Sequence, residues 1–298
     1  MIDVYKDCSA LYPQIMIYGE PWTGGTSKLK AGISDTALDG QTTVQESLAQ
    51  DFFSGSNILV GAFNDVIRNA ARGENSPGKG YVQGDTLSTS LVAMCAEGVF
   101  SKGTVKTQNI NPNLVLNYVS CHDNYTLYDQ LAQTMDAGRL QNAYTQADAI
   151  VFLSEGVPFI QEGEEFMRSK YDARTGKYEG NSYNVGDSVN LMDYSLKAAH
   201  ADVFAKTCEL IRFRKAQAAF RLASRAEISA KVTDMVQQGG NISFKADGLL
   251  VFHSISGMQA ELDGTWKVLY SNVRDAGETL SGTFSIGTNE SIVLGKAE

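Results

Sequence analysis

Short apolar runs alternate with amphipathic stretches from the N-terminus to about residue 219. Four of these runs have the length and flanking turn residues of buried strands: 15–19, 58–63, 115–120 and 157–161. The stretches between them have helical periodicity, most clearly at 86–97, 141–154 and 201–218. Strands that alternate with helices along a chain predict a parallel sheet covered by helices.

The periodicity changes beyond residue 221. The segments "NISFKADGLLVFHSISG", "WKVLYSNV", "TLSGTFSIG" and "ESIVLG" alternate apolar and polar residues and are separated by Gly, Asn and Asp. This pattern predicts a small antiparallel β domain. We therefore expect an α/β domain over 1–222 and an all-β domain over 223–298, with Trp266 buried in the second.

Composition narrows the classes of partner. The chain has 298 residues, 43% of them hydrophobic, and a formal net charge of −9. A polyanion repels nucleic acid and anionic membranes, so we expect neither as a partner. The four cysteines have no zinc-ligand spacing, and no apolar run approaches the ~18 residues of a membrane span. We expect a cytoplasmic location if no signal peptide precedes this chain.

Polar side chains follow all four predicted strands. They are Glu20, the pair 64–65, the triplet His122, Asp123 and Asn124, and the acids within 161–165. Because the carboxyl ends of parallel strands meet at one edge of a sheet, these residues are the candidates for chemistry. For Asn64 and Asp65 we expect helix capping instead, since both residue types accept hydrogen bonds from a first helical turn.

Five segments, in this order along the chain, resemble a known family: "YGEPWTGG", "FNDVIRNAARG", "VLNYVSCHDN", "GVPFIQEGEEFMRSK" and "NSYNVGDSVNLMDY". They resemble type I pullulanases, the α-1,6 debranching members of the α-amylase superfamily (glycoside hydrolase family 13). The resemblance implies the C-terminal half of a (β/α)8 TIM barrel, strands five to eight, followed by a small antiparallel β-sandwich. It also implies an α-glucan substrate: pullulan, limit dextrin or glycogen.

The resemblance assigns roles to matching residues. Glu20 would be the general acid/base and Asp123 a second catalytic carboxylate that binds the sugar hydroxyls. The substrate-binding residues would be His122, Trp22, Asn124, Asn184, Asp187 and Asn190. Alternatives remain for several of these residues: Trp22 is equally consistent with core packing, and loops rich in Asn and Asp are often solvated turns. No cofactor is expected; some relatives carry structural calcium, which no spacing here indicates.

The sequence departs from the family pattern in two ways: it lacks the nucleophile motif, and it has too few strands for a closed barrel. A retaining glycosidase needs a nucleophilic carboxylate about 5 Å from the acid, and the family's "FRFD"-type nucleophile motif does not occur in this sequence. Four strands also cannot close a barrel that needs about eight. We therefore expect a missing N-terminal barrel half as a partner and no activity from the isolated chain. The alternatives are a non-catalytic α-glucan-binding or regulatory remnant and a parallel α/β protein of other specificity.

Overall fold

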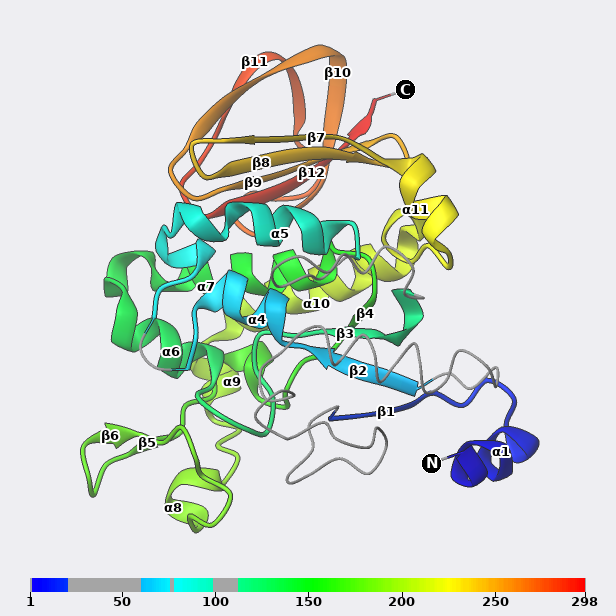
Figure 1. Ribbon diagram of the computed structural model, residues 1–298. Helices are drawn as coiled ribbons and strands as arrows, with labels where there is room; N and C mark the ends of the chain where they lie inside the picture. Colours follow the sequence, from blue (N-terminus) through cyan, green and yellow to red (C-terminus); the bar gives the residue numbers. More distant parts are fainter. Residues whose placement is uncertain (1, 21–59, 76–77, 99–111, 298) are drawn as a thin grey trace.

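The computed structural model describes residues 2–20, 60–75, 78–98 and 112–297 in three layers. Figure 1 shows an antiparallel sheet at the top, a layer of helices in the middle and a parallel sheet below. Both sheets pack their apolar faces against the helical layer, as layered domains require. No helix among the described residues is long and apolar enough to cross a membrane.

The parallel sheet has four strands in chain order. They are β1 (Ile17–Gly19), β2 (Val60–Asn64), β3 (Val115–Asn117) and β4 (Val157–Pro158). All three pairings between neighbours are parallel, and each strand lies within or close to the range predicted from the sequence. The loops that leave the carboxyl ends of these strands therefore share one edge of the sheet.

Asn64 fixes the first turn after β2. Its side-chain oxygen accepts from the backbone N–H groups of Val66 at 3.1 Å and of Ile67 at 3.4 Å, which caps α4 (Asp65–Arg72). Its amide nitrogen donates to the side chain of Asn117 on β3 at 2.9 Å. The predicted capping role is confirmed for Asn64. One side chain thus joins two strands and a helix at the edge where the loops meet.

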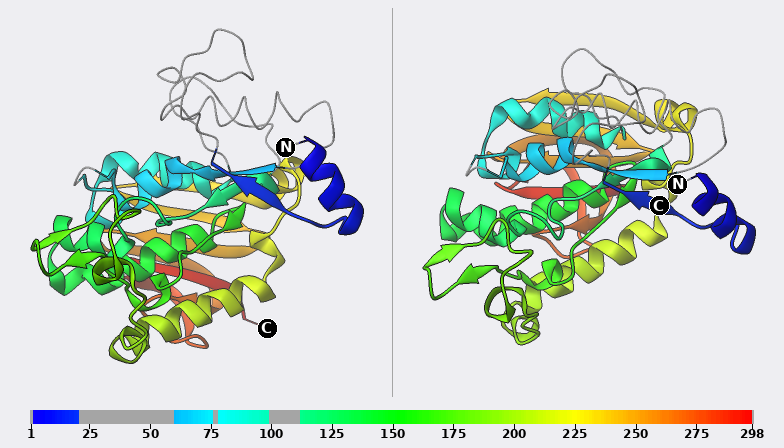
Figure 2. Two further views of the ribbon diagram at one scale, coloured as in Figure 1. Left: turned by 90° about the horizontal axis from the view of Figure 1, so that it is seen from below. Right: turned by 60° about the horizontal axis from the view of Figure 1, so that its bottom comes forward.

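The remaining helices are α1 (Ile2–Leu11), α5 (Thr89–Ala96), α6 (Leu127–Thr134), α7 (Ala137–Phe152), α8 (Asp187–Asn190), α9 (Leu196–Ala199), α10 (Ala201–Ala216) and α11 (Arg225–Lys231). Of these, α5, α7 and α10 lie with α4 between the two sheets (Figure 1). Short 3-10 turns are η1 (Tyr81–Gln83), η2 (Thr86–Ser88), η3 (Pro112–Leu114), η4 (Glu164–Phe166) and η5 (Ala218–Phe220). Figure 2 shows α1 projecting from the body of the molecule beside β1. A hairpin of β5 (Tyr171–Asp172) and β6 (Lys177–Tyr178) extends near α8.

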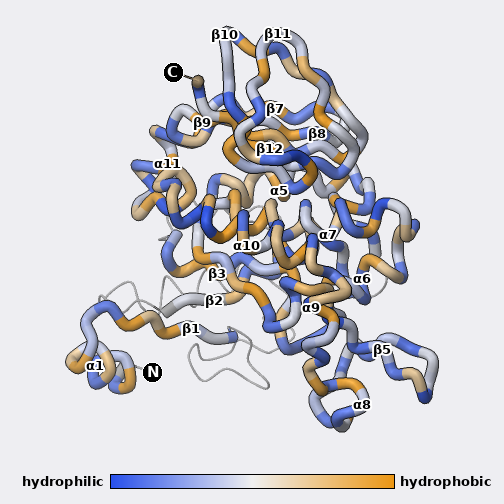
Figure 3. Tube along the Cα trace, turned by 180° about the vertical axis from the view of Figure 1, so that it is seen from behind, coloured by the Kyte–Doolittle hydropathy of each residue, from blue (hydrophilic) through white to orange (hydrophobic). Residues whose placement is uncertain are grey.

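The two faces of the parallel sheet differ in what covers them. Val115 belongs to the core that the helices share, whereas its neighbour Leu116 faces a separate cluster with Phe63, Tyr118 and Cys121. This is the alternation expected along a strand. Figure 3 shows hydrophobic stretches along β1 and β3.

The C-terminal domain is one curled sheet and not two facing sheets. Its strands are β7 (Val232–Gln238), β8 (Asn241–Ala246), β9 (Leu249–Ser254), β10 (Met258–Ser271), β11 (Thr279–Ile286) and β12 (Glu290–Lys296). They pair antiparallel in the order β11-β10-β12-β9-β8-β7. The predicted sandwich is corrected in this respect.

The physical reason lies in β10, a strand of 14 residues with two register shifts. Such irregularities bend a strand, and Figure 1 shows β10 and β11 arching over the other strands. One sheet can therefore surround its own core, in which Trp266 is buried as expected beside Phe252 and Phe284.

Candidate active site

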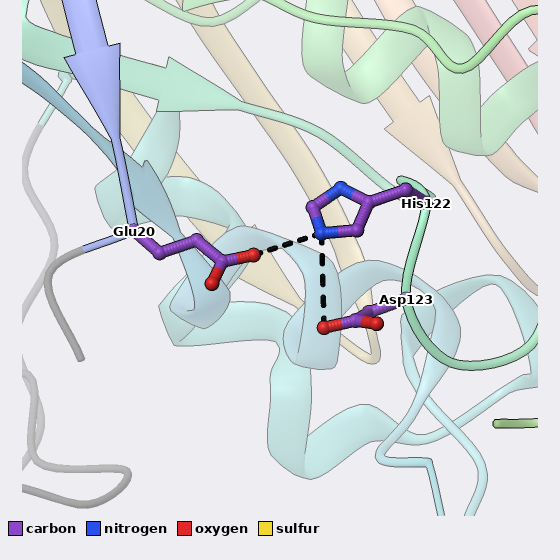
Figure 4. A group of neighbouring side chains, drawn as sticks. All are labelled: Glu20, His122 and Asp123. Atoms are coloured by element: carbon purple, nitrogen blue, oxygen red, sulfur yellow. Dashed lines mark ion pairs between the residues drawn. The ribbon is translucent and has the colours of Figure 1, made fainter. Parts of the chain in front are cut away.

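Three of the predicted residues meet at the carboxyl edge of the parallel sheet. His122 Nε2 lies 2.8 Å from Glu20 Oε1 and 3.8 Å from Asp123 Oδ2. Figure 4 shows Nε2 of the imidazole facing both carboxyl groups. The side chains of Glu20, His122 and Asp123 are 43%, 62% and 54% exposed. An acid, an imidazole and a second acid thus face a common, open space.

The two segments that carry this group come from different strands. Glu20 directly follows Gly19 at the end of β1, and the His-Asp pair lies five residues beyond Asn117 at the end of β3. The loop after β3 ends at Thr126, whose hydroxyl accepts from the Asp129 N–H at 3.1 Å and caps α6. Residues about a hundred positions apart in the sequence become neighbours because both strands are parallel.

A buried carboxyl pair lies directly behind this loop. The Ser120 hydroxyl, two residues before His122, donates to Glu164, and Glu164 hydrogen-bonds to Asp148 of α7. Among the described residues, Asp148 Oδ1 and Glu164 Oε1 have no hydrogen-bond partner. Two carboxyl groups can hydrogen-bond to each other only if one of them carries a proton.

Burial sets the protonation of this pair. It raises the pKa of Glu164 to about 7, although hydrogen bonds from Ser120 and Asp148 oppose the rise. Burial and the neighbouring Glu164 raise the pKa of Asp148 well above its usual value. Asp148 therefore keeps the proton and donates it to Glu164 at neutral pH. The buried Arg72 nearby favours the ionised form of Glu164, and burial lowers the pKa of Arg72 itself to about 10.

Comparison with known proteins finds pullulanases among the curated proteins. No family model matches the chain. The pullulanase of Bacillus subtilis is 32% identical over 174 residues, which cover 57% of this chain and 23% of that protein. The pullulanase of Klebsiella pneumoniae is 26% identical over 243 residues, covering 66% and 20%. This chain is similar to pullulanases.

Solved pullulanase structures match nearly the whole chain. The pullulanase from Bacillus acidopullulyticus aligns over 98% of this chain and 35% of its own, with 28% identity and a TM-score of 0.77. The pullulanase of Anoxybacillus sp. LM18-11 in complex with maltotetraose aligns over 99% of this chain and 41% of its own, with 24% identity and a TM-score of 0.79. The pullulanase-like chain thus spans less than half the length of these relatives.

Other predicted residues lie apart from the three-residue group or make different contacts. The backbone of Asn124 is left-handed, with φ 66°, and its side chain is partly exposed. Asn184 and Asp187 are exposed on the loop around α8. The amide of Asn190 donates to the carbonyls of Ser182 and Val185, so it closes that loop. Trp22 lies outside the described residues.

The three-residue group also has the chemistry of metal ligands. One ligand atom from each of Glu20, His122 and Asp123 lies within 4.8 Å of the other two. Exposed acidic groups are common without a bound ion, and two carboxylates with one imidazole on open loops do not select a particular metal. The arrangement therefore supports acid–base chemistry and carries no metal assignment.

Proposed function

We propose that this chain is part of an α-1,6-glucan debranching hydrolase of the retaining type. Glu20 is the general acid/base, Asp123 binds the hydroxyls of the reacting sugar, and His122 donates a hydrogen bond to the same ring. The observation that carries the proposal is the convergence of these three side chains at the carboxyl edge of the parallel sheet. The similarity to pullulanases supports the substrate class.

Each residue has a chemically suited task in such a reaction. Glu20 protonates the glycosidic oxygen as the bond to it breaks, and its carboxylate then takes a proton from the water that completes hydrolysis. Hydroxyl contacts to Asp123 and His122 strengthen as the sugar ring flattens toward an oxocarbenium ion. His122 also orients the carboxyl of Glu20, because the two are 2.8 Å apart.

The nucleophile and the rest of the barrel come, in this proposal, from polypeptide outside this sequence. Strands β1 to β4 then correspond to strands five to eight of a (β/α)8 barrel. Two features of the described residues support this. Met16, directly before β1, and Tyr18, within it, expose 40% and 49% of their surface. At the other edge a groove of about 370 Å³ runs beside β4, lined partly by Val157, Pro158 and Ile211.

The test places this chain in an enzyme that has all eight strands. In a chimera, residues of this chain replace the structurally matched segment of the Bacillus acidopullulyticus pullulanase, and release of reducing ends from pullulan is measured. We expect hydrolysis by the chimera, and a loss of kcat of roughly 10²- to 10⁴-fold in its Glu20→Gln variant. The Glu162→Gln variant, an exposed acid elsewhere on this face, is the control. Full activity of the folded Glu20→Gln chimera would refute the assignment.

A non-catalytic glucan-binding remnant is the second candidate, favoured by the absence of an "FRFD"-type motif from the 298 residues. It predicts saturable binding of maltotriose to this chain together with a chimera that folds and binds pullulan but does not hydrolyse it. Hydrolysis by the chimera would exclude this candidate.

A further inference from the structure

We infer that Lys170 is a positioning residue that holds His122 and Asp123 in register with Glu20; this inference rests on the proposed function. Lys170 follows η4 and is only 1% exposed. Its ammonium group donates to the backbone carbonyl of His122 at 3.1 Å and to that of Asn124 at 2.8 Å. These two carbonyls flank Asp123 on either side.

The loop needs such a support because its backbone is not relaxed. Asn124 adopts φ 66°, a left-handed conformation that few residues other than glycine adopt and that Asn enters more readily than most. The Lys170 ammonium binds the carbonyl of Asn124 itself and that of His122, two residues earlier. Its hydrogen bonds therefore select the conformation in which the Asp123 side chain lies beside His122.

Lys170 is itself held from a second direction. The carboxylate of Asp129, at the start of α6, is fully buried. It accepts hydrogen bonds from the backbone N–H of Lys170 at 2.8 Å and from the Ser169 hydroxyl at 2.5 Å. Asp129 in turn follows the loop that Lys170 supports. The ammonium group is thus fixed relative to α6, and α6 is fixed relative to the loop.

The Lys170 ammonium is a buried charge that contacts backbone carbonyls and not a carboxylate. A buried ammonium group is costly unless it is paired, and burial lowers the pKa of Lys170 while Arg168 adds to the decrease. Within the described part of the chain, the ammonium forms hydrogen bonds to carbonyls of the loop and no ion pair at 4 Å or less. The buried ammonium group therefore binds the backbone of the loop that carries Asp123.

The chain contains a matched control. Lys206 on α10 also donates to two backbone carbonyls, those of Ser271 at 3.1 Å and Arg274 at 2.7 Å, but these lie in the C-terminal domain. Lys170→Met and Lys206→Met remove the same group from a pair of backbone carbonyls, although Lys206 is partly exposed and also forms an ion pair with Glu209 at 3.1 Å. Only the first variant removes it from the loop that carries His122.

The readout is the imidazole signals of the chain labelled with 15N-histidine. The chain has three histidines, His122, His200 and His253, so assignment needs only their substitution one at a time. In the ligand-free chain we expect Lys170→Met to shift or broaden the signals of His122 and to leave those of His253 in place. Lys206→Met should leave the His122 signals unchanged. If His122 is undisturbed in Lys170→Met, Lys170 has no positioning role.

Glucan binding separates this inference from the proposed function. Titration with maltotriose should shift the His122 signals of the unsubstituted chain, and Lys170→Met should weaken the binding about tenfold or more, since small misplacements of site residues are costly. A chimera that folds but does not hydrolyse pullulan contradicts the proposed function, and Lys170 is then judged on the ligand-free spectra of this chain. Circular dichroism shows whether Lys170→Met folds. If it does not fold, Lys170→Gln, which keeps an N–H donor, is measured in its place. A shift of the His122 signals in Lys170→Gln supports the inference, and unchanged His122 signals contradict it.

Discussion

Replacing Glu164 by glutamine tests whether the buried carboxyl pair behind the candidate site makes stability depend on pH. In the parent chain Glu164 accepts from Ser120 and from the protonated Asp148. Glutamine has nearly the same shape, so its oxygen can still accept from Ser120 and its amide can donate to Asp148. The substitution therefore removes the ionisable group at residue 164 and keeps the hydrogen bond from Ser120, whereas the hydrogen bond with Asp148 reverses its direction.

The magnitude follows from the pKa of Glu164, which rises from 4.5 to about 7 on folding. Each pKa unit corresponds to about 1.4 kcal/mol, so the carboxyl accounts for about 3 kcal/mol. The folded state binds this proton more tightly than the unfolded state. Stability from this source is therefore fully present below pH 4.5 and is lost as the pH rises to about 7. Asp148 acts in the same direction because its pKa is also raised.

The assay is urea denaturation at a series of pH values, followed by far-ultraviolet circular dichroism. Between about pH 4.5 and pH 8 the free energy of unfolding of Glu164→Gln should fall by about 3 kcal/mol less than that of the parent chain. Glu162→Gln removes one carboxylate from an exposed position two residues away and is the control. Parallel pH profiles of the parent chain and Glu164→Gln would show that folding does not raise the pKa of Glu164.

Three further substitutions test the packing that presents the site, each by the urea midpoint of the chain. Asn64→Ala removes the cap of α4 and a buried side-chain hydrogen bond, so it should cost about 2 kcal/mol or more, and Asn64→Asp, which keeps the cap acceptor, should cost less. Gly61→Val should cost about 1–3 kcal/mol, because a Cβ at residue 61 would lie 2.7 Å from Leu116 Cδ1; an unchanged midpoint would contradict that close approach. Tyr81→Phe should cost about 1 kcal/mol by removing the hydroxyl that donates to the His253 carbonyl at 2.9 Å.

Hydrophobic periodicity was sufficient to predict the order of elements. The four strand predictions fall on or beside β1 to β4, and the change of period after residue 221 predicted the antiparallel domain. The sandwich prediction was wrong in its topology because alternation along β10 does not reveal where the strand bends. A bend depends on which residues of neighbouring strands oppose one another, and that register is not a local property of sequence.

The candidate site was predictable only where it follows strands. Glu20, His122 and Asp123 could be named because parallel strands place their following loops at one edge. Lys170 could not, since nothing in "FMRSKYD" distinguishes a buried lysine from a solvated one until the loop after β3 is folded against it. Glu164 is one of the acids named after the fourth predicted strand, but its link to Asp148, which joins an α7 residue to a residue after β4, was not predicted. Such links depend on tertiary packing and leave no periodic signal.

If the proposed function is right, the same polypeptide outside this sequence would both cover the exposed site and supply its nucleophile. A general acid works best where water is excluded and its surroundings are fixed, yet Glu20 and Asp123 are 43% and 54% exposed. Behind them, Glu164, Lys170 and Asp129 are buried and hydrogen-bonded, so the inner support of the site is already complete. What is open is the side toward which β1 presents Met16 and Tyr18. Polypeptide that covers that side would exclude water and bring the third carboxylate in the same step, so glucan hydrolysis and burial of Glu20 should appear together in the chimera.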